Sequence, residues 1–176
     1  MGDQYIVKRI DEKISIAAPK IKTITRGYIK ELSDRALSDI EQNHFDSAIT
    51  KSRTLLEEVF IFVIEQQKAP PPHNGKINEL YKEVKNLYNM HADPNTDRRI
   101  NSLLSGLEKI ISSITEMRNA EGDAHGVENR RMGIDDYHAR LFVNAATTVA
   151  DFILSVANKH NERCLKNADS KKHQRF

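Results

Sequence analysis

The stretch from Met117 to Gly126, MRNAEGDAHG, places several groups that could do chemistry close together in the chain. Arg118 carries a permanent charge and can bind a phosphate or a carboxylate through two N–H groups. His125 has an ordinary pKa of about 6.5, so it can accept or donate a proton near neutral pH. Asn119 can hydrogen-bond an anion or hold a turn. Together these side chains could hold an anion and move a proton beside it.

The same residues also have structural interpretations. Arg118 could pair with a carboxylate on a facing helix, because a partly buried guanidinium needs an anion. His125 could be an ordinary surface histidine in a turn between two glycines. The spacing recurs from Arg131 to His138, where we interpret His138 as a structural residue in the first turn of a helix. Spacing alone therefore leaves both interpretations open.

Composition predicts an all-helical protein with one domain. The chain has 176 residues, 39% hydrophobic and 30% charged, with no Trp and 6% aromatic residues, so its core should consist of aliphatic side chains and alanine. The formal net charge of +2 does not by itself indicate a nucleic-acid binder. The single cysteine, Cys164, excludes an intrachain disulfide and favours a cytoplasmic setting.

Nothing in the sequence predicts a membrane anchor. The longest uninterrupted apolar run, Val59 to Ile64, is far shorter than the ~20 residues that span a bilayer. Gly2 is followed by Ile6 where a myristoylation signal has Ser or Thr.

Apolar residues recur at helical spacing, which predicts a bundle of four to five helices over residues 26–163. A short N-terminal arm, 1–25, precedes it, and a basic tail, 164–176, follows it. The expected helices are 26–42, a second one capped by Asp46 with apolar positions from Ala48 to Ile64, 77–88, 97–119 and 135–160.

The helix expected over 97–119 has the most regular apolar repeat, so it should lie along another helix. Arg118 follows Ile114 by four positions, at the edge of that repeat. The helix over 135–160 is rich in alanine, which allows close approach of a neighbour. Because these two helices offer more packing surface than one small bundle needs, we predict a homodimer formed through them.

Two further groups of charges have two interpretations each. Arg53 and Glu57 lie one helical turn apart, and we favour an exposed surface pair over a role in a site. The basic end of the chain is either a solvated, frayed terminus, which we favour, or a segment that binds RNA phosphates. The tail residues in question are Lys166, Lys171, Lys172 and Arg175.

Three runs, in this order, resemble the C-terminal domain of bacterial abortive-infection proteins, which belongs to the HEPN group of helical domains. The runs are LSDIEQNHFDSAITKSRTLLEEVF, LLSGLEKIISSITEMRNAEGDAHGV and YHARLFVNAATTVADFIL, and the resemblance covers residues 28–157. It implies a bundle of four or five helices that is often dimeric. It also implies RNA cleavage without a metal by an arginine, a following polar residue and a histidine, which match Arg118, Asn119 and His125.

The chain departs from part of this family in two ways. Members regulated by modification of a tyrosine two residues after the histidine would need Tyr at 127, where this chain has Val127, so that regulation is not implied. Larger members carry further domains upstream, and only about 25 residues precede the similar region here. We therefore expect an inhibitory or sensing function to come from a partner protein.

The sequence thus predicts a cytoplasmic RNA endonuclease of the phage-defence or toxin type, acting in antiviral abortive infection without a cofactor. The alternative is a non-catalytic helical module that binds RNA or a protein. A metal enzyme is poorly supported, because His44, His73, His91 and His125 fall in separate turns without metal-ligand spacing.

Overall fold

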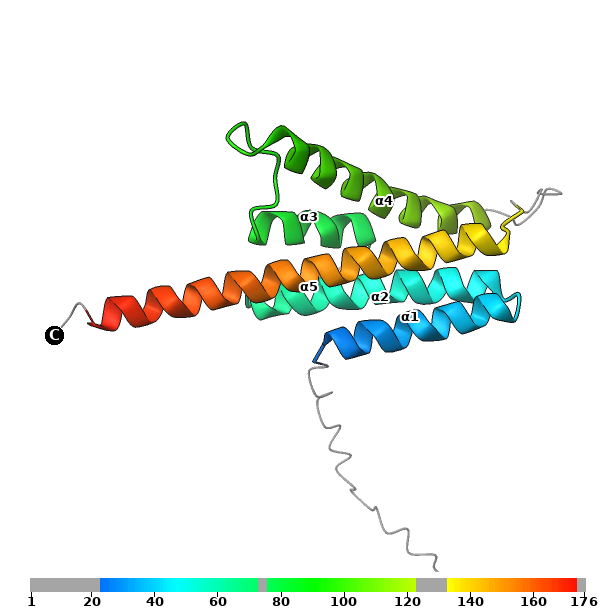
Figure 1. The fold of residues 1–176 in the computed structure, drawn as a ribbon, viewed down its shortest axis with the longest axis horizontal. Coiled ribbons are helices and arrows are strands. Elements are labelled where there is room, and N and C mark those ends of the chain that lie inside the picture. The colour runs from blue at the N-terminus through cyan, green and yellow to red at the C-terminus, as the bar shows by residue number, and fades with distance from the viewer. Residues whose placement is uncertain (1–22, 73–75, 123–132, 174–176) are drawn as a thin grey trace, which may run out of the picture.

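The structure is a computed structural model that describes residues 23–72, 76–122 and 133–173, with side chains except those of 117–122 and 168–173. Every regular element in this part of the chain is an α-helix (Figure 1), which confirms the all-α bundle. The helices are α1 (Arg26–Glu41), α2 (Phe45–Gln66), α3 (Ile77–Leu87), α4 (Arg98–Gly122) and α5 (Asp136–His173).

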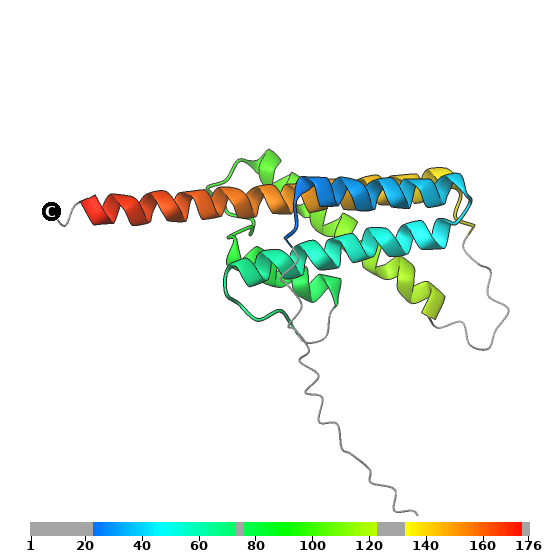
Figure 2. The ribbon, with the colours of Figure 1, turned by 90° about the horizontal axis from the view of Figure 1, so that it is seen from below.

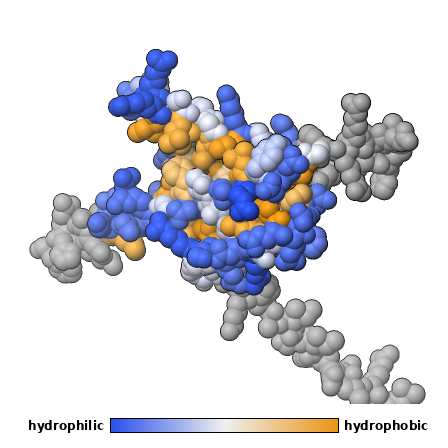
Figure 3. Space-filling model, turned by 45° about the vertical axis from the view of Figure 1, so that its right-hand side comes forward, coloured by the Kyte–Doolittle hydropathy of each residue, from blue (hydrophilic) through white to orange (hydrophobic). Residues whose placement is uncertain are grey.

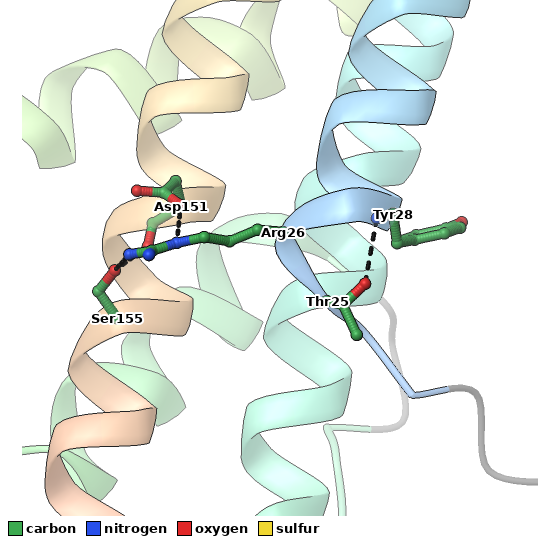
Figure 4. Close-up of polar contacts among 5 residues, drawn as sticks. All are labelled: Thr25, Arg26, Tyr28, Asp151 and Ser155. Atoms are coloured by element: carbon green, nitrogen blue, oxygen red, sulfur yellow. Dashed lines mark hydrogen bonds and ion pairs between the residues drawn. The ribbon is translucent and has the colours of Figure 1, made fainter.

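Helix α1 begins where the sequence predicts. The backbone N–H of Tyr28 donates to Oγ1 of the N-cap residue Thr25 at 3.2 Å, which satisfies one of the free donors at the helix start. In the same first turn, Arg26 reaches across to α5, with Nε 2.8 Å from Oδ1 of Asp151 and Nη2 2.9 Å from Oγ of Ser155 (Figure 4). The cap and this cross-link fix the start of α1 against α5.

Helix α2 is the centre of the bundle. Its buried residues occupy most of the circumference, because α1, α3 and α5 all pack on it. Its fully enclosed side chains are Leu55, Leu56, Val59, Phe60, Val63 and Ile64. The prediction that Asp46 caps this helix is wrong: the N-cap is His44, and Asp46 lies in the first turn, where its charge suits the positive end of the helix dipole.

Helix α5 packs against α1 and α2 through small residues. Ala139, Ala146, Ala150 and Ala157 are completely buried, which lets the helices approach closely. By length and composition alone, the part Asp136–Asn167 could cross a membrane, but the core helix of a bundle passes the same test. Its buried alanines and its packing on two neighbours fit that core role.

The end predicted for this last helix, about residue 160, is wrong. Helix α5 continues to His173, through the predicted start of the tail at 164. Its C-terminal part projects beyond the other helices in both ribbon views (Figures 1 and 2), and Leu165 there is exposed. Residues 161–173 contain no Pro or Gly and many good helix formers, so helix can continue without a partner on its surface.

Helices α3 and α4 form a second layer over α2 and α5 (Figure 1). Tyr81 of α3 packs on Phe60 with ring centroids 5.8 Å apart. The residue after α3, Tyr88, donates its hydroxyl proton to the carbonyl of Val63 at 2.7 Å. The chain leaves α3 through Asn89, whose φ of 52° ends the helix.

The regular apolar repeat of α4 is only partly used within the chain. Ile111 and Ile114 are buried, whereas Ile100 and Leu103 are 51% and 72% exposed. The expectation that the repeat lies along another helix therefore holds for the C-terminal half, which packs on α3 and α5, and not for the N-terminal half.

Candidate functional site

The C-terminal end of α4 carries two of the three predicted site residues. Arg118 and Asn119 lie in its last turns, one turn beyond the buried Ile114. That part of α4 is held by Thr115, whose hydroxyl donates to Oδ1 of Asn78 at the start of α3, 3.2 Å away. The backbone at Arg118 and Asn119 is thus positioned by buried contacts with the core and a polar contact with α3; their side chains lie outside the described part.

His125 lies outside the described residues, as do Arg131 and the other residues between Gly122 and Gly133. The two described elements that flank it, the end of α4 and the start of α5, lie at the same end of the bundle (Figure 1). The proximity of His125 to Arg118 and Asn119 stays a prediction.

Arg53 and Glu57 form the ion pair that the sequence predicted, but the pair is not on the exposed surface. Nε and Nη2 of Arg53 lie 2.8 and 2.7 Å from Oε1 of Glu57, and the two side chains are 14% and 28% exposed. Spacing identified the pair and could not reveal its burial, because burial depends on how the other helices pack around α2.

A family model described as the HEPN-like domain matches residues 28–157 of this helical bundle. The chain belongs to the HEPN-like domain family. The match begins in α1 and ends in α5, and it includes Arg118, Asn119 and His125, so the predicted resemblance to the abortive-infection C-terminal domain is confirmed. The chain shows no significant similarity to a curated protein or to a solved structure.

His138 has a structural place in the HEPN-like domain, as its position predicted. It lies in the first turn of α5, where its Nδ1 accepts a hydrogen bond from the backbone N–H of Asp135 at 3.3 Å. Its ring packs at a tilt against that of Tyr137, with centroids 4.0 Å apart. The hydrogen bond from Asp135 satisfies a backbone donor at the helix start, which is an N-capping role.

The basic residues of the predicted tail begin on the projecting part of α5. Lys166 is exposed on that helix; Lys171 and Lys172 belong to its last turns, with side chains outside the described part, and Arg175 lies beyond the described residues. Sequence reasoning missed that Lys159 and Arg163 precede Lys166 by seven and three positions, on the same face of the continuous helix. Recognising that the helix continues past 160 would have joined them.

A surface groove of ≈ 580 Å³ lies on the HEPN-like domain between the start of α1, the end of α2 and α5. Its cations are already matched by carboxylates: Arg26 pairs with Asp151, and Nζ of Lys159 lies 3.7 Å from Oε2 of Glu162. The groove is lined by Thr23, Ile24, Thr25, Arg26, Phe62, Gln66, Leu154, Ser155, Asn158, Lys159 and Glu162, none of which is a predicted catalytic residue. It is thus separate from the residues at the end of α4.

Proposed function

We propose that this HEPN-like domain is a metal-independent RNA endonuclease of the phage-defence or toxin type. The observation that carries the proposal is the family match over residues 28–157, which contains an arginine, an asparagine and a histidine in the order and spacing of the predicted site. Arg118 and Asn119 share the last turns of a helix whose preceding turn is anchored in the core, which suits a site that must hold a phosphate in a fixed place.

The proposed reaction needs one base, one acid and one cation. A base removes the proton of an RNA 2′-hydroxyl, the oxygen attacks the adjacent phosphorus, and the bond from phosphorus to the 5′ oxygen breaks. An acid protonates that 5′ oxygen, so the products are a 2′,3′-cyclic phosphate and a 5′-hydroxyl, and no water, metal or oxidant is consumed. His125 serves as base or acid, while Arg118 and Asn119 bind the phosphate as its negative charge grows.

One histidine does not easily supply both proton transfers, so a second copy of the chain would complete the site. The proposed homodimer forms through α4 and α5, which carry the large apolar side chains left exposed in the described part of those helices: Ile100, Leu103, Ile110, Tyr137, Leu141 and Leu165. Figure 3 shows hydrophobic surface gathered on this side of the molecule between charged regions. Large exposed apolar groups on neighbouring elements are typical of association surfaces.

The proposed setting is the cytoplasm, with RNA as substrate and an inhibitory or sensing protein as partner. The basic face of the projecting α5, with Lys166 and the predicted Lys171, Lys172 and Arg175, supplies RNA affinity rather than chemistry.

The decisive experiment measures cleavage of a mixed RNA pool by His125→Ala and Arg118→Ala proteins in the presence of a chelator. Each substitution should lower the rate by about a hundredfold or more, the scale for loss of an acid–base group or a charge stabiliser. His138→Ala and Arg99→Ala are matched controls, because both residues are exposed and neither belongs to the predicted site. Circular dichroism checks that each variant is folded.

A substrate test separates the proposed chemistry from other cleavage. An oligonucleotide with a single 2′-deoxy residue at the cut position should resist cleavage there, because the attacking hydroxyl is missing. Parental cleavage by folded His125→Ala protein, with contaminating nucleases excluded, would remove this site.

The second candidate function is a non-catalytic module that binds RNA or a protein. The observations that favour it are the apolar edge of α4 and the projecting α5, either of which could dock a partner without chemistry. Tight RNA binding by the parental protein with no cleavage under any tested condition would support this function.

A further inference from the structure

We infer that the groove beside the start of α1 is the docking site of a partner protein, which fills it with an amphipathic helix that is apolar on one face and acidic on the adjoining flank. The docking does not depend on the proposed function. Its effect on RNA rests on that function and adds a mode of inhibition to it.

The groove continues the seat that α1 occupies in the bundle. Arg26 at the start of α1 bonds to Asp151 of α5. Ser33, about two turns later, bonds to Thr147, so α1 and α5 run antiparallel. Helix α2 is likewise antiparallel to α1, because a short turn joins the two. The furrow between α2 and α5 therefore extends past the first residue of α1 (Figures 1 and 2).

The lining of the groove is partly apolar and partly polar. Ile24, Phe62 and Leu154 supply the apolar part, and Phe62 keeps some of its surface exposed. Gln66 and Asn158 add side-chain amides. The volume of ≈ 580 Å³ lies within the range of about 300–1,000 Å³ that is usual for ligand sites. Apolar side chains of a partner would gain free energy by covering this lining.

A helix fits the groove because the same two helices already hold α1 in the adjoining part of the furrow. Helix α1 fills its part with residues at three- and four-residue steps, among them Ile29 and Ala36, which are 3% and 1% exposed. A second helix with an apolar stripe at this spacing would continue the same packing. An amphipathic helix laid into an apolar groove is a common mode of protein recognition.

The edge of α5 beside the groove is basic. Lys159 lines the groove, and Arg163 and Lys166 follow it by four and seven positions on the same face. Over residues 158–167 these three cations stand against one carboxylate, Glu162. Its Oε2 lies 3.7 Å from Nζ of Lys159, and both side chains are more than half exposed, so this pair is weak. The edge therefore attracts the acidic flank of a partner.

A protein segment suits the groove better than RNA. Glu162 on the groove wall would repel the phosphates of a strand laid along it. Arg26, on the side of α1, already bonds to Asp151 and Ser155 (Figure 4). Apolar side chains meet neither obstacle, because they carry no charge.

The docked helix gives the partner a way to inhibit. In the proposed function Lys166 attracts RNA, and it belongs to the basic edge beside the groove. A carboxylate placed against Lys166 competes with RNA phosphates for its charge. The partner thus lowers RNA affinity without touching the end of α4, which lies toward the other end of the bundle (Figure 1).

The test uses the full chain and a fluorescent synthetic peptide of about 14 residues, roughly four helical turns, with leucine at three- and four-residue steps and glutamate at the other positions. A second peptide with lysine in place of every glutamate is the matched probe for charge. Fluorescence anisotropy at low salt should show micromolar binding of the acidic peptide and binding of the lysine peptide that is weaker by about tenfold or more.

Substitutions on α5 locate the bound peptide. Asn158→Trp fills the groove from an exposed position and should weaken binding of the acidic peptide by about tenfold or more. Asn144→Trp is the matched control, because Asn144 is also exposed on α5 but does not line the groove, and it should match the parent. Lys159→Glu should weaken binding several-fold by reversing a charge, and it keeps the test decisive should Asn158→Trp fail to fold.

Other occupants of the groove give different results. RNA affinity, measured with single-stranded RNA in a His125→Ala background, should be unchanged by Asn158→Trp, and a loss would make RNA the occupant and overturn the inference. Displacement of the probe by a synthetic peptide of residues 1–22 at lower concentration than by unlabelled acidic peptide would assign the groove to the chain's own N-terminal segment. A lower mass of Asn158→Trp protein than of the parent in light scattering would assign it to a second copy.

The outcomes for the groove and for the proposed function are independent. No binding of the acidic peptide, equal binding of the lysine peptide, or parental affinity in folded Asn158→Trp and Lys159→Glu proteins would overturn the docking site. The proposed function would still stand if His125→Ala is inactive. Full cleavage by His125→Ala would overturn that function and the effect on RNA, but not the docking.

Discussion

Helices α2 and α4 both carry apolar repeats at helical spacing, but the fold uses them differently. In α2 every apolar position from Leu55 to Phe60 is buried, because three helices pack around it. Among the side chains of α4 that the structure describes, only Ile111 and Ile114 are buried, and Leu103 near its start is 72% exposed. An apolar repeat at helical spacing therefore predicts that one face of the helix becomes buried. It does not tell whether the element that buries this face belongs to the same chain.

This difference separates a buried scaffold from a layer that is partly exposed. Helices α1, α2 and α5 make the most extensive contacts with one another and form the scaffold of the bundle. Helix α4 rests on this core through its C-terminal half, so the turn that carries Arg118 is anchored while the N-terminal apolar edge stays available.

The largest expected effect on stability comes from the scaffold. Phe60→Ala should lower the free energy of unfolding by about 3–5 kcal/mol, because it removes a ring with no exposed surface and leaves a cavity. Leu103→Ala on α4 should change it by less than about 0.5 kcal/mol at a protein concentration where the chain is monomeric. Urea unfolding of both variants measures this contrast, and equal losses would show that α4 is as integral to the core as α2.

The next effect is a loss of stability at alkaline pH through Tyr81, which joins the two layers. Burial, with a contribution from the charge of Glu108, raises the pKa of Tyr81 to about 12. The neutral phenol is favoured in the fold, so stability is fully present below the unfolded pKa of about 10 and is lost as pH rises toward 12. The loss should approach about 2–3 kcal/mol, from two pKa units at about 1.4 kcal/mol each.

Tyr81→Phe should remove this part of the pH dependence while keeping the ring that packs on Phe60. Unfolding midpoints measured from about pH 8, below the unfolded pKa of about 10, to about pH 11.5, just below the folded pKa of about 12, test it. The same alkaline decline in both proteins would mean that Tyr81 does not ionise upon unfolding in the way its burial implies.

The sequence predicted most of the scaffold because local signals and buried periodicity agree there. The helices expected over 26–42 and 77–88 agree with α1 and α3 to within one residue, and the apolar positions expected from Ala48 to Ile64 lie on α2. Asp46 was misleading because it is as favourable inside a first helical turn as at a cap. The extension of α5 beyond 160 was missed because a polar helix without a packed face has no apolar period.

The candidate site was less predictable because its geometry depends on contacts between helices far apart in sequence. Spacing placed Arg118 near the end of a helix, and its backbone lies in the last turns of α4. The direction of its side chain stays a prediction. Spacing gave the wrong environment for Arg53, since an ion pair at four-residue spacing looks the same in a sequence whether exposed or enclosed.

The exposed edge of α4 supplies the third prediction, a homodimer. Light scattering at micromolar concentration should give about twice 20.1 kDa for the parent. Leu103→Glu should shift the mass to that of a monomer, because a charge placed in an apolar interface loses its hydration without a partner. Lys109→Glu on the opposite side of α4 is the matched control and should stay dimeric. A monomeric parent would remove the shared-site argument but not the fold.

The smallest expected effect concerns the projecting end of α5, which lies outside both layers. Deleting the residues after Asn167 removes Lys171, Lys172 and Arg175 and no described side chain of the core. Stability should therefore change by less than about 0.5 kcal/mol. RNA affinity should weaken, and the slope of log K against log [salt] should fall by up to about 0.7 for each phosphate that the tail neutralises.

The single-turnover cleavage rate at saturating RNA should stay close to that of the parent, because in this proposal the tail attracts RNA and contributes nothing to the chemistry. A full-length protein in which Lys171, Lys172 and Arg175 are all changed to alanine is the matched control, since it removes the charges and keeps the chain length. If both proteins lose affinity equally, charge is the cause. A fall in the saturated rate of either protein would place the end of α5 in the active site, and the division into a scaffold, a catalytic layer and a separate RNA-attracting arm would have to be abandoned.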